Sequence, residues 1–581
     1  MVPERFDAMA KLARFFPFLG WARTYDGATL GSDLLAAVIV TIMLIPQSLA
    51  YAMLAGLPAE VGLYASILPL VAYALFGTSR TLAVGPVAVV SLMTASAVGQ
   101  IAGEGTLDYL TAAAGLALLS GGMLAAMGIF RLGFLANFLS HPVISGFITA
   151  SGLLIAAGQL RHVLGVSGGG NTLPEIVRSL AGQMGAINPV TLAIGLGALA
   201  FLVFARKYLK RLLIGLRVPA RPADMMTKAA PILAVAATIA LAIGLDLGAR
   251  GVALVGAIPQ GLPRLGVPAL SLDLVTALLA PAFLISVVGF VESVSVGQTL
   301  AAKRRQRIEP DQELIGLGAA NIAAGLSSGY PVTGGFARSV VNFDAGAQTP
   351  AAGVFTAVGI GLAALFLTPL LVNLPQATLA ATIIVAVLTL VDFAAIRRVF
   401  AYSRSDFAAM AATIVVTLGW GVELGIVCGV VLSLLLHLYR TSKPHVAIVG
   451  QVPGTEHYRN IDRHAVLTHP EIVSIRIDES LYFANSRFLE DTIAAQVAER
   501  PALKHVVLMC SAVNAIDASA LESLEEINRR LVDIGIGFHL SEVKGPVMDR
   551  LKGTDFLRHL NGRIFLSQHE AVASLRAQPA S

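Results

Sequence analysis

Two short stretches interrupt the apolar segments of this chain and constrain its fold more than any other feature. One is TLAVGPV at residues 81–87, and the other is SGYPVTGGF at residues 328–336. Each has a proline in an extended run and continues into an apolar, helix-like stretch. Because proline lacks an amide hydrogen and pushes the residue before it toward extended geometry, each helix is expected to begin inside the membrane.

A helix that begins at membrane depth leaves its first N–H groups without partners and points the positive end of its dipole at the space in front of it. Such groups are tolerated there only where they line a cavity or bind a ligand, and the ligand that suits them is an anion. Broken segments in corresponding places of two halves are typical of a secondary transporter with an internal repeat.

The composition places most of the chain in lipid. The 581 residues are 56% hydrophobic and 13% charged, with a mean hydropathy of +0.75, whereas a soluble domain has about 25% charged residues. Hydropathy predicts about fourteen segments that cross or enter the bilayer. They are 33–55, 61–77, 84–101, 108–129, 134–158, 189–205, 229–246, 275–297, 312–327, 333–343, 350–368, 378–391, 405–419 and 421–439.

The charges between these segments predict the orientation. With a cytoplasmic N-terminus, the inner loops hold most cations, above all the cluster between Arg206 and Lys228, and the outer loops are poorer in them. This asymmetry requires an even number of crossings and places both termini in the cytoplasm. Residues 1–30 are expected to form a cytoplasmic N-terminal segment, either an amphipathic interfacial stretch or a solvated tail. The two cysteines, Cys428 and Cys510, form no disulfide framework or metal-ligand pattern.

The composition becomes that of a soluble domain after Thr441. Strand-length apolar runs alternate with amphipathic helices at 487–499 and 518–533; the runs are 446–449, 472–477, 505–510, 537–540 and 563–566. This alternation predicts a cytoplasmic α/β domain over 441–581, following a membrane domain over 31–440.

Four motifs, in order along the chain, point to a family. They are IPQSLAYA at 45–52, VGP at 84–86, GFVES at 289–293 and GFARSVVN at 335–342. With these motifs and its tail, the chain resembles the SulP sulfate permeases, anion transporters whose vertebrate relatives include chloride/bicarbonate exchangers and prestin. The resemblance covers nearly the whole length. It implies a seven-plus-seven inverted repeat, a core domain moving against a gate domain, a homodimer, and a C-terminal STAS domain.

Glu292 lies in the middle of the eighth apolar segment. A carboxylate at the centre of a bilayer is costly, so an intramembrane acid is a functional candidate; the alternative is an acid paired internally to hold helices together. The resemblance implies that this position couples transport to a cation. In sodium-dependent bicarbonate relatives an Asp here is joined by a Thr one turn later, where this chain has Val296. The missing hydroxyl favours protons over sodium.

Arg338 is expected about two turns into the tenth segment. Its guanidinium is always charged and offers several donors, which suits an oxyanion, and the resemblance places the matching Arg beside the anion. The alternative is a counter-ion for Glu292. Gln47 is expected to donate into the same cavity or to form a helix–helix hydrogen bond, and Phe336 to close one wall or to pack in the core. The predicted anion-binding residues are Gln47, Gly85, Pro86, Val87, Ala88, Gly334, Gly335, Phe336 and Arg338.

The tail motif AIDASAL at 515–521 is similar to the loop-to-helix motif of STAS domains. In the bacterial anti-sigma factor antagonists, which have the STAS fold, the residue after the Asp is the serine that kinases phosphorylate. Here Ala518 follows Asp517, so that switch has no hydroxyl to act on. Asp517 and Ser519 are both suitable helix N-caps. We therefore expect scaffolding or trafficking rather than signalling.

The sequence predicts a transporter of a small oxyanion in the cytoplasmic membrane, with sulfate taken up together with protons as the first choice. Bicarbonate and a C4-dicarboxylate such as succinate or fumarate remain open, and a membrane sensor that signals through STAS is the alternative from another class. Intact Glu292 and Arg338 argue against the sensor. The sequence contains no P-loop, metal-ligand cluster or nucleophile–base pair, so no enzyme, metal or cofactor is expected. The expected partners are the anion, protons, lipid and a second copy of the chain, and not nucleic acid.

Overall fold

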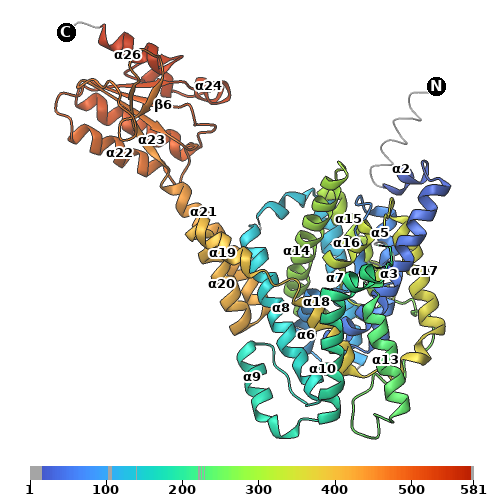
Figure 1. The fold of residues 1–581 in the computed structure, drawn as a ribbon. Coiled ribbons are helices and arrows are strands. Elements are labelled where there is room, and N and C mark those ends of the chain that lie inside the picture. Colours follow the sequence, from blue (N-terminus) through green and yellow to red (C-terminus); the bar gives the residue numbers. More distant parts are fainter. Residues whose placement is uncertain are drawn as a thin grey trace, which may run out of the picture. The chain divides into compact units, whose positions relative to one another are not determined.

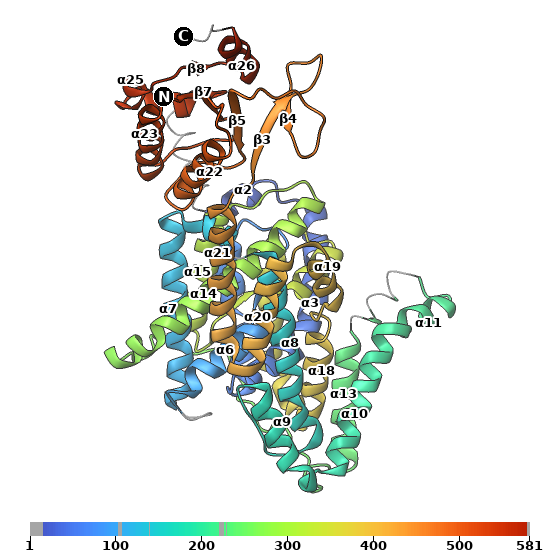
Figure 2. The ribbon, with the colours of Figure 1, turned by 90° about the vertical axis from the view of Figure 1, so that its left-hand side faces the viewer.

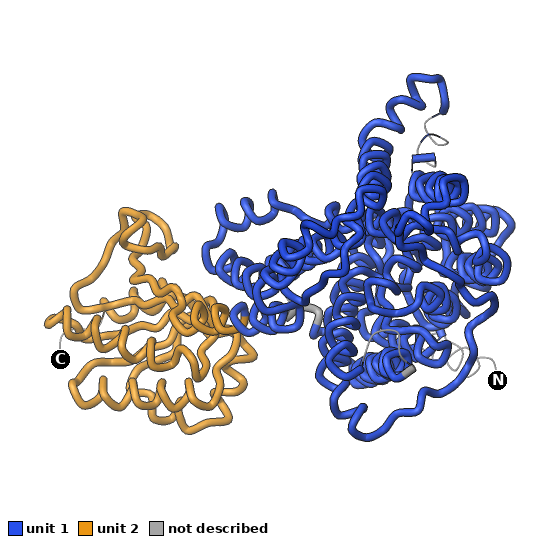
Figure 3. The backbone as a smooth tube through the Cα atoms, turned by 90° about the horizontal axis from the view of Figure 1, so that it is seen from below, with its two compact units in different colours: residues 1–433 blue, residues 434–581 orange. Residues whose placement is uncertain are grey.

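The computed structural model describes residues 16–577 except 103–106, 139, 220–222, 224–225 and 228. Residues 1–15 of the predicted N-terminal segment and part of the basic loop between Arg206 and Lys228 lie outside the described residues. The chain forms two compact units, residues 1–433 and 434–581 (Figure 3). The boundary between them falls inside helix α21 (Val422–Ser442), as does the boundary at 440 that the sequence predicts.

Unit 1 is helical (Figures 1 and 2). Within the described residues, seven helical spans are long and apolar enough to cross a membrane, and four shorter apolar helices accompany them. Each of the predicted membrane segments contains one or two helices, which confirms the predicted fold class. The helices that precede α21 are α2 (Phe18–Ala22), α3 (Gly27–Leu54), α4 (Ala59–Tyr64), α5 (Leu68–Phe76), α6 (Ala88–Gly99), α7 (Leu107–Ile129), α8 (His141–Leu164), α9 (Leu173–Gly182), α10 (Pro189–Phe204), α11 (Lys210–Gly215), α13 (Ala230–Gly244), α14 (Leu272–Lys303), α15 (Pro310–Leu326), α16 (Phe336–Asp344), α17 (Ala351–Phe366), α18 (Gln376–Val387), α19 (Phe393–Tyr402) and α20 (Arg404–Trp420).

Some details of the segment prediction are wrong. The second segment is two helices, α4 and α5, with a turn at residues 65–67 between them. The fifth begins at His141 instead of 134, because Leu132–Phe138 forms a 3-10 helix. Helices α9 and α19 were not predicted, because each has only ten residues and carries two charged side chains, which hides it in a hydropathy profile.

Two buried carboxylates tie helices of unit 1 together. Glu313 of α15 accepts hydrogen bonds from the Tyr73 hydroxyl (2.7 Å), the Thr78 N–H (2.7 Å) and hydroxyl, and the Ser79 N–H (3.0 Å). Asp33 of α3 accepts from the Gln348 N–H (2.6 Å) and from the Thr349 N–H (3.2 Å) and hydroxyl (2.6 Å), just before α17. Both side chains are fully buried, and this many donors compensates for the loss of water.

Unit 2 contains a six-stranded sheet in the order β4-β3-β5-β6-β7-β8. Strands β5 to β8 are parallel neighbours, and β3 is antiparallel to β4 and β5. The predicted strands and the two predicted helices are confirmed, whereas the three-residue β4 and the short helices α24, α25 and α26 were not predicted. The elements are β3 (Val446–Gln451), β4 (Tyr458–Asn460), β5 (Ile472–Ile477), α22 (Ser486–Ala498), β6 (His505–Met509), α23 (Ala518–Asp533), β7 (Gly537–Ser541), α24 (Gly545–Lys552), α25 (Phe556–His559), β8 (Ile564–Phe565) and α26 (Gln568–Arg576).

The sheet of unit 2 separates two hydrophobic clusters. Alternate strand residues point to opposite faces, so Val506 and Leu508 join α22 and α23, while Val507 joins α26 on the other face. The unit therefore has its own core.

The close approach of α4 to α3 should depend on Gly62. A Cβ at this position would lie 1.9 Å from the Ser48 carbonyl oxygen, which is backbone and cannot swing away. We expect Gly62→Ala to destabilise the protein by about 1–3 kcal/mol, as overpacking does. The measurement is thermal unfolding in detergent. Gly197→Ala on α10 is the matched control, because a Cβ there meets nothing within 4 Å. An equal loss of stability in both variants would contradict the prediction.

Candidate functional site

A two-stranded ribbon joins the two proline-broken stretches. Strand β1 (Val84–Gly85) pairs antiparallel with β2 (Thr333–Gly334), with Val84 opposite Gly334 and Gly85 opposite Thr333. Helix α6 begins three residues after β1, and α16 begins two residues after β2. The two helix starts therefore lie next to each other, and their position at the middle of the membrane stays a prediction.

Neither helix start carries a side-chain cap. The N-cap residues are Val87 for α6 and Gly335 for α16, and neither forms a capping hydrogen bond through its side chain. The first-turn N–H groups have no acceptor within their own helix. A small anion in front of the two starts would meet these N–H groups and the positive ends of two helix dipoles.

A cavity of about 50 Å³ lies at the two helix starts. Eight of the ten residues predicted for binding or ion coupling line it: Gln47, Pro86, Val87, Ala88, Glu292, Gly335, Phe336 and Arg338. A cavity of this size holds a few water molecules or one small ion. The structure thus brings together residues from α3, α6, α14 and α16.

Arg338 supplies a buried cation to the cavity. It is the third residue of α16 and lies in its first turn, so the predicted position two turns into the helix is wrong. The side chain is only 2% exposed, and Nη2 donates to the Thr333 carbonyl oxygen (3.3 Å). Nε and Nη1 are buried without any hydrogen-bond partner among the described residues. Such unpaired donors of a buried charge point to a ligand that the protein itself does not supply.

Two glycines make room for this guanidinium. A Cβ on Gly335 would lie 2.8 Å from Nε of Arg338, and a Cβ on Gly85 would lie 2.9 Å from Nη1. Gly85 also has a φ of +156°, at the edge of the region that side chains avoid. Gly85 therefore leaves space for the Arg338 guanidinium and does not itself line the cavity. Gly334 does not line it either, because the side chain of Leu82 lies against it.

Glu292 of α14 lines the same cavity. Within the part of the chain that the structure describes, its carboxylate makes no hydrogen bond and no ion pair, with Arg338 or with any other residue. The amide of Gln47 also makes no hydrogen bond among these residues. The alternative for Glu292 was an acid paired internally to hold helices together, and the alternative for Gln47 was a hydrogen bond between helices. Neither interaction is present among the described residues.

Polar side chains hold the ribbon in place. Ser293 Oγ accepts from the Gly334 N–H (2.9 Å) and donates to the Gly289 carbonyl (2.7 Å). The Asn321 amide forms two bonds with the backbone of Val332, both 2.9 Å. The Ser339 hydroxyl accepts from the Ala83 N–H (3.0 Å). Side chains thus replace the missing sheet partners of an isolated two-stranded ribbon.

Sequence reasoning missed part of the cavity wall. Tyr51, Ala386 and Leu390 also line it, and the last two come from α18 and the turn after it. An Ala and a Leu in an apolar segment give no chemical signal, so only the packing reveals their position.

A larger cavity of about 290 Å³ adjoins the first one and shares Gln47, Ala337 and Ala386 with it. It lies between α3 and α16 on one side and α10, α13 and α18 on the other. Arg206 lines it from the π-helical turn Ala205–Leu209 that follows α10. This arrangement is suited to an access path that ends at Arg338.

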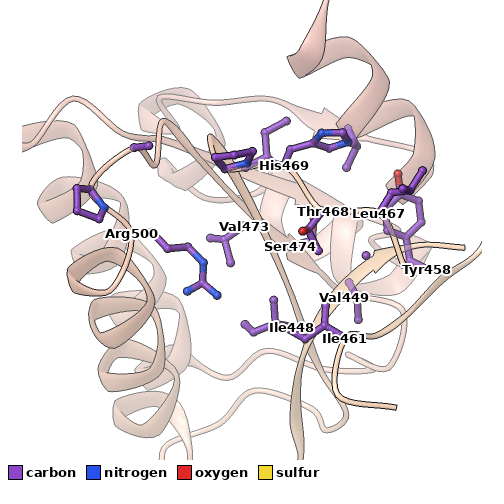
Figure 4. A pocket seen from close by; sticks show the side chains of 16 residues that line it. Ile448, Val449, Tyr458, Ile461, Leu467, Thr468, His469, Val473, Ser474 and Arg500 are labelled. Atoms are coloured by element: carbon purple, nitrogen blue, oxygen red, sulfur yellow. The ribbon is translucent and has the colours of Figure 1, made fainter. Parts of the chain in front are cut away.

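Unit 2 has a separate set of candidate residues. Asp517 caps α23 as predicted, because Oδ1 accepts from the Ala520 N–H (2.8 Å), and Oδ2 accepts from the Phe483 N–H (2.9 Å). Ala518 and Ser519 are the first two residues inside the helix, so Ser519 is not its cap. None of the three lines the cavity of about 350 Å³ in this unit, where Arg500 projects over an apolar floor (Figure 4).

Among the described residues, no cluster of three His, Cys, Asp or Glu could hold a metal ion.

Two half-helices that meet at a cavity inside a polytopic helical domain define a class, the multi-pass membrane transporters. A family model described as the sulfate permease family matches residues 30–413, and a STAS domain model matches residues 464–571. The chain therefore belongs to the sulfate permease family and is an anion transporter of that family.

The chain is similar to several named proteins. Sulfate transporter 4.1, chloroplastic, of Arabidopsis thaliana is 38% identical over 525 residues, which are 88% of this chain and 75% of that protein. The probable sulfate transporter Rv1739c of Mycobacterium tuberculosis is 34% identical over 569 residues, 96% of this chain and 98% of that protein.

Two solved structures share the fold. Murine Slc26a9 in the inward-facing state superposes with a TM-score of 0.88 at 23% identity, covering 98% of this chain and 95% of that chain. The transmembrane domain of the cyanobacterium bicarbonate transporter BicA gives 0.59 at 21% identity, covering 70% and 98%. At these identities the likeness concerns the fold alone.

The unpaired guanidinium leads to a test of its role. Arg338→Ala should weaken equilibrium sulfate binding about ten- to a hundred-fold, since a charge-assisted hydrogen bond is worth roughly 1.5–3 kcal/mol. Arg338→Lys should recover part of the affinity, because the charge returns without the planar fork. Isothermal titration calorimetry on the purified protein measures both. If Arg338 is only the counter-ion of Glu292, combining Arg338→Ala with Glu292→Gln should restore the binding that the single change lost.

Proposed function

We propose that this protein is a secondary active transporter that takes up sulfate together with protons. One observation carries the proposal: the Arg338 guanidinium is buried with two unpartnered donors beside a cavity formed at two uncapped helix starts. Arg338 and the two helix starts favour a negative charge at this site, and the Glu292 carboxylate is the group available for a proton.

The size of the cavity supports a compact anion. Its volume of about 50 Å³ suits a tetrahedral or planar oxyanion better than a four-carbon dicarboxylate. The relatives with the highest identities reported above carry sulfate in their names, and BicA carries bicarbonate. Sulfate is therefore our first choice, and bicarbonate is the second.

Proton coupling follows from like-charge repulsion. Sulfate carries two negative charges, and an ionised Glu292 in the same cavity would repel it. A proton on Glu292 removes that repulsion, so anion and proton bind best together. Sodium is less suited, because Val296, one helical turn after Glu292, offers no oxygen ligand.

The remaining assignments belong to the same proposal. The protein is placed in the cytoplasmic membrane with both termini inside, with domains at 1–30, 31–440 and 441–581, and it works as a homodimer without cofactor, metal or catalytic activity. The STAS domain serves in scaffolding or trafficking, because Ala518 replaces the phosphorylated serine of the antagonists.

Purified protein in liposomes tests the function. Uptake of labelled sulfate, bicarbonate and succinate is compared with and without an inward proton gradient. We expect sulfate accumulation that requires the gradient. Gradient-independent uptake of bicarbonate with no sulfate uptake would favour the second choice, and a lack of transport of all three anions would favour the sensor.

Glu292→Gln should separate binding from coupling. The amide keeps the shape of the carboxyl group but cannot exchange a proton. We expect sulfate binding within a few-fold of the wild type, and loss of proton-driven accumulation. Calorimetry gives the binding and liposome uptake gives the coupling. If wild-type uptake requires sodium and does not respond to pH, the proton assignment is wrong.

A further inference from the structure

A second polar pocket lies away from the transport cavity, between the loop before β1 and the end of α14. Its volume is about 300 Å³, and Ser79, Arg80, Thr81, Gln306 and Arg307 line it. The chain reverses at the end of α14, where Arg305 has a φ of +54° and the Gln306 N–H donates to the Ala301 carbonyl (2.9 Å). This reversal brings Arg307 back toward residues 79–81.

Both arginines of the pocket are unpaired. Neither Arg80 nor Arg307 forms an ion pair or a side-chain hydrogen bond with another described residue. A third guanidinium, that of Arg304, lies close enough for its charge to interact with Arg80, although it already donates to the Phe343 carbonyl (3.0 Å). Asp33 offsets part of the charge of Arg304, whereas no carboxylate lines the pocket beside Arg80 and Arg307. A bound anion would relieve the repulsion between these like charges.

One hydroxyl of the pocket is also available as a donor. Ser79 and Thr81 are only 2% and 4% exposed. The Ser79 oxygen accepts from the Leu82 N–H (3.2 Å), and its hydroxyl is also hydrogen-bonded to Tyr73. The Thr81 hydroxyl has no hydrogen-bond partner among the described residues. No Asp or Glu lines the pocket, and the nearby Glu313 is already occupied by four other donors.

We propose that this pocket is a second oxyanion site, distinct from the transport cavity, that binds a sulfate or phosphate group through Arg80, Arg307 and the hydroxyl of Thr81. Two guanidiniums and one hydroxyl match the several acceptor oxygens of a tetrahedral oxyanion. The group can come from a free anion or from the phosphodiester of an anionic lipid, since both present the same oxygens.

The position of the pocket links it to the transport cavity. The Thr81 carbonyl accepts from the Asn342 amide (3.0 Å) of α16, and the chain then enters β1, whose Gly85 lies against Arg338. The other wall of the pocket is the end of α14, the helix that carries Glu292. An oxyanion held here would fasten together the two segments that bear the binding and coupling residues.

The test separates the two sites. Full-length protein carrying Arg338→Ala, which removes the first site's cation, is titrated calorimetrically in detergent with inorganic phosphate and with sulfate. A remaining binding event is expected, weakened about ten- to a hundred-fold by adding Arg80→Gln and Arg307→Gln. Arg397→Gln is the matched control, an exposed arginine on α19 outside the pocket, and should change nothing. Thermal unfolding confirms that each variant is folded, and Arg80→Lys with Arg307→Lys should retain part of the affinity.

A second experiment tests whether the oxyanion comes from a lipid headgroup or from a free anion. The same variants are reconstituted in nanodiscs of phosphatidylcholine with phosphatidylglycerol, and native mass spectrometry counts the retained phosphatidylglycerol. Retention that depends on Arg80 and Arg307, without phosphate binding in detergent, assigns the site to a lipid headgroup. Phosphate binding alone assigns it to a free anion. If neither measurement depends on these two arginines, the proposal is overturned, while the transport site tested through Arg338 is unaffected.

Discussion

The structure of unit 1 depends on how backbone N–H groups are satisfied at membrane depth. The ribbon of β1 and β2 pairs the backbone of the two extended stretches, and Ser293, Asn321 and Ser339 satisfy most of what remains. The first turns of α6 and α16 stay open. The open N–H groups and the unpaired donors of Arg338 therefore lie at the same small cavity, where an anion can use them.

Three acids in the helices of unit 1 show how structural and functional charges differ. Asp33 and Glu313 each accept several hydrogen bonds and fasten helices together. Glu292 accepts none among the described residues and faces a cavity. A carboxylate whose donors are built into the protein keeps a constant charge, whereas one facing a cavity can change its charge with the ligand. The acid that the protein leaves unsatisfied is thus the one we propose as the coupling residue.

The sequence predicted the parts of the site that depend on local chemistry. Proline and glycine at 85–86 and 331–335 mark the broken helices, and an isolated Glu292 in an apolar run marks the coupling candidate. The sequence did not predict features that arise from packing. Gly85 and Gly335 serve Arg338 by leaving space for its guanidinium, and Leu390 reaches the cavity only because α18 packs beside α3. Nothing in the sequence distinguishes Asn321 from other polar residues in helices, and only the fold shows that its amide binds the backbone of Val332.

The charges of the proposed transport site suit co-transport of a dianion with one proton. Arg338 contributes one positive charge, and each helix start contributes roughly half an elementary charge, so together they offset about two negative charges. Sulfate supplies these two charges. An ionised Glu292 would leave the loaded site with an extra negative charge in a low-dielectric environment, which is costly. A protonated Glu292 leaves the loaded site nearly neutral, and a nearly neutral site crosses the membrane interior at the lowest electrostatic cost. In this mechanism the proton is required because the positive charge at the cavity offsets the sulfate, and an ionised Glu292 would compete with the sulfate for the charge of Arg338.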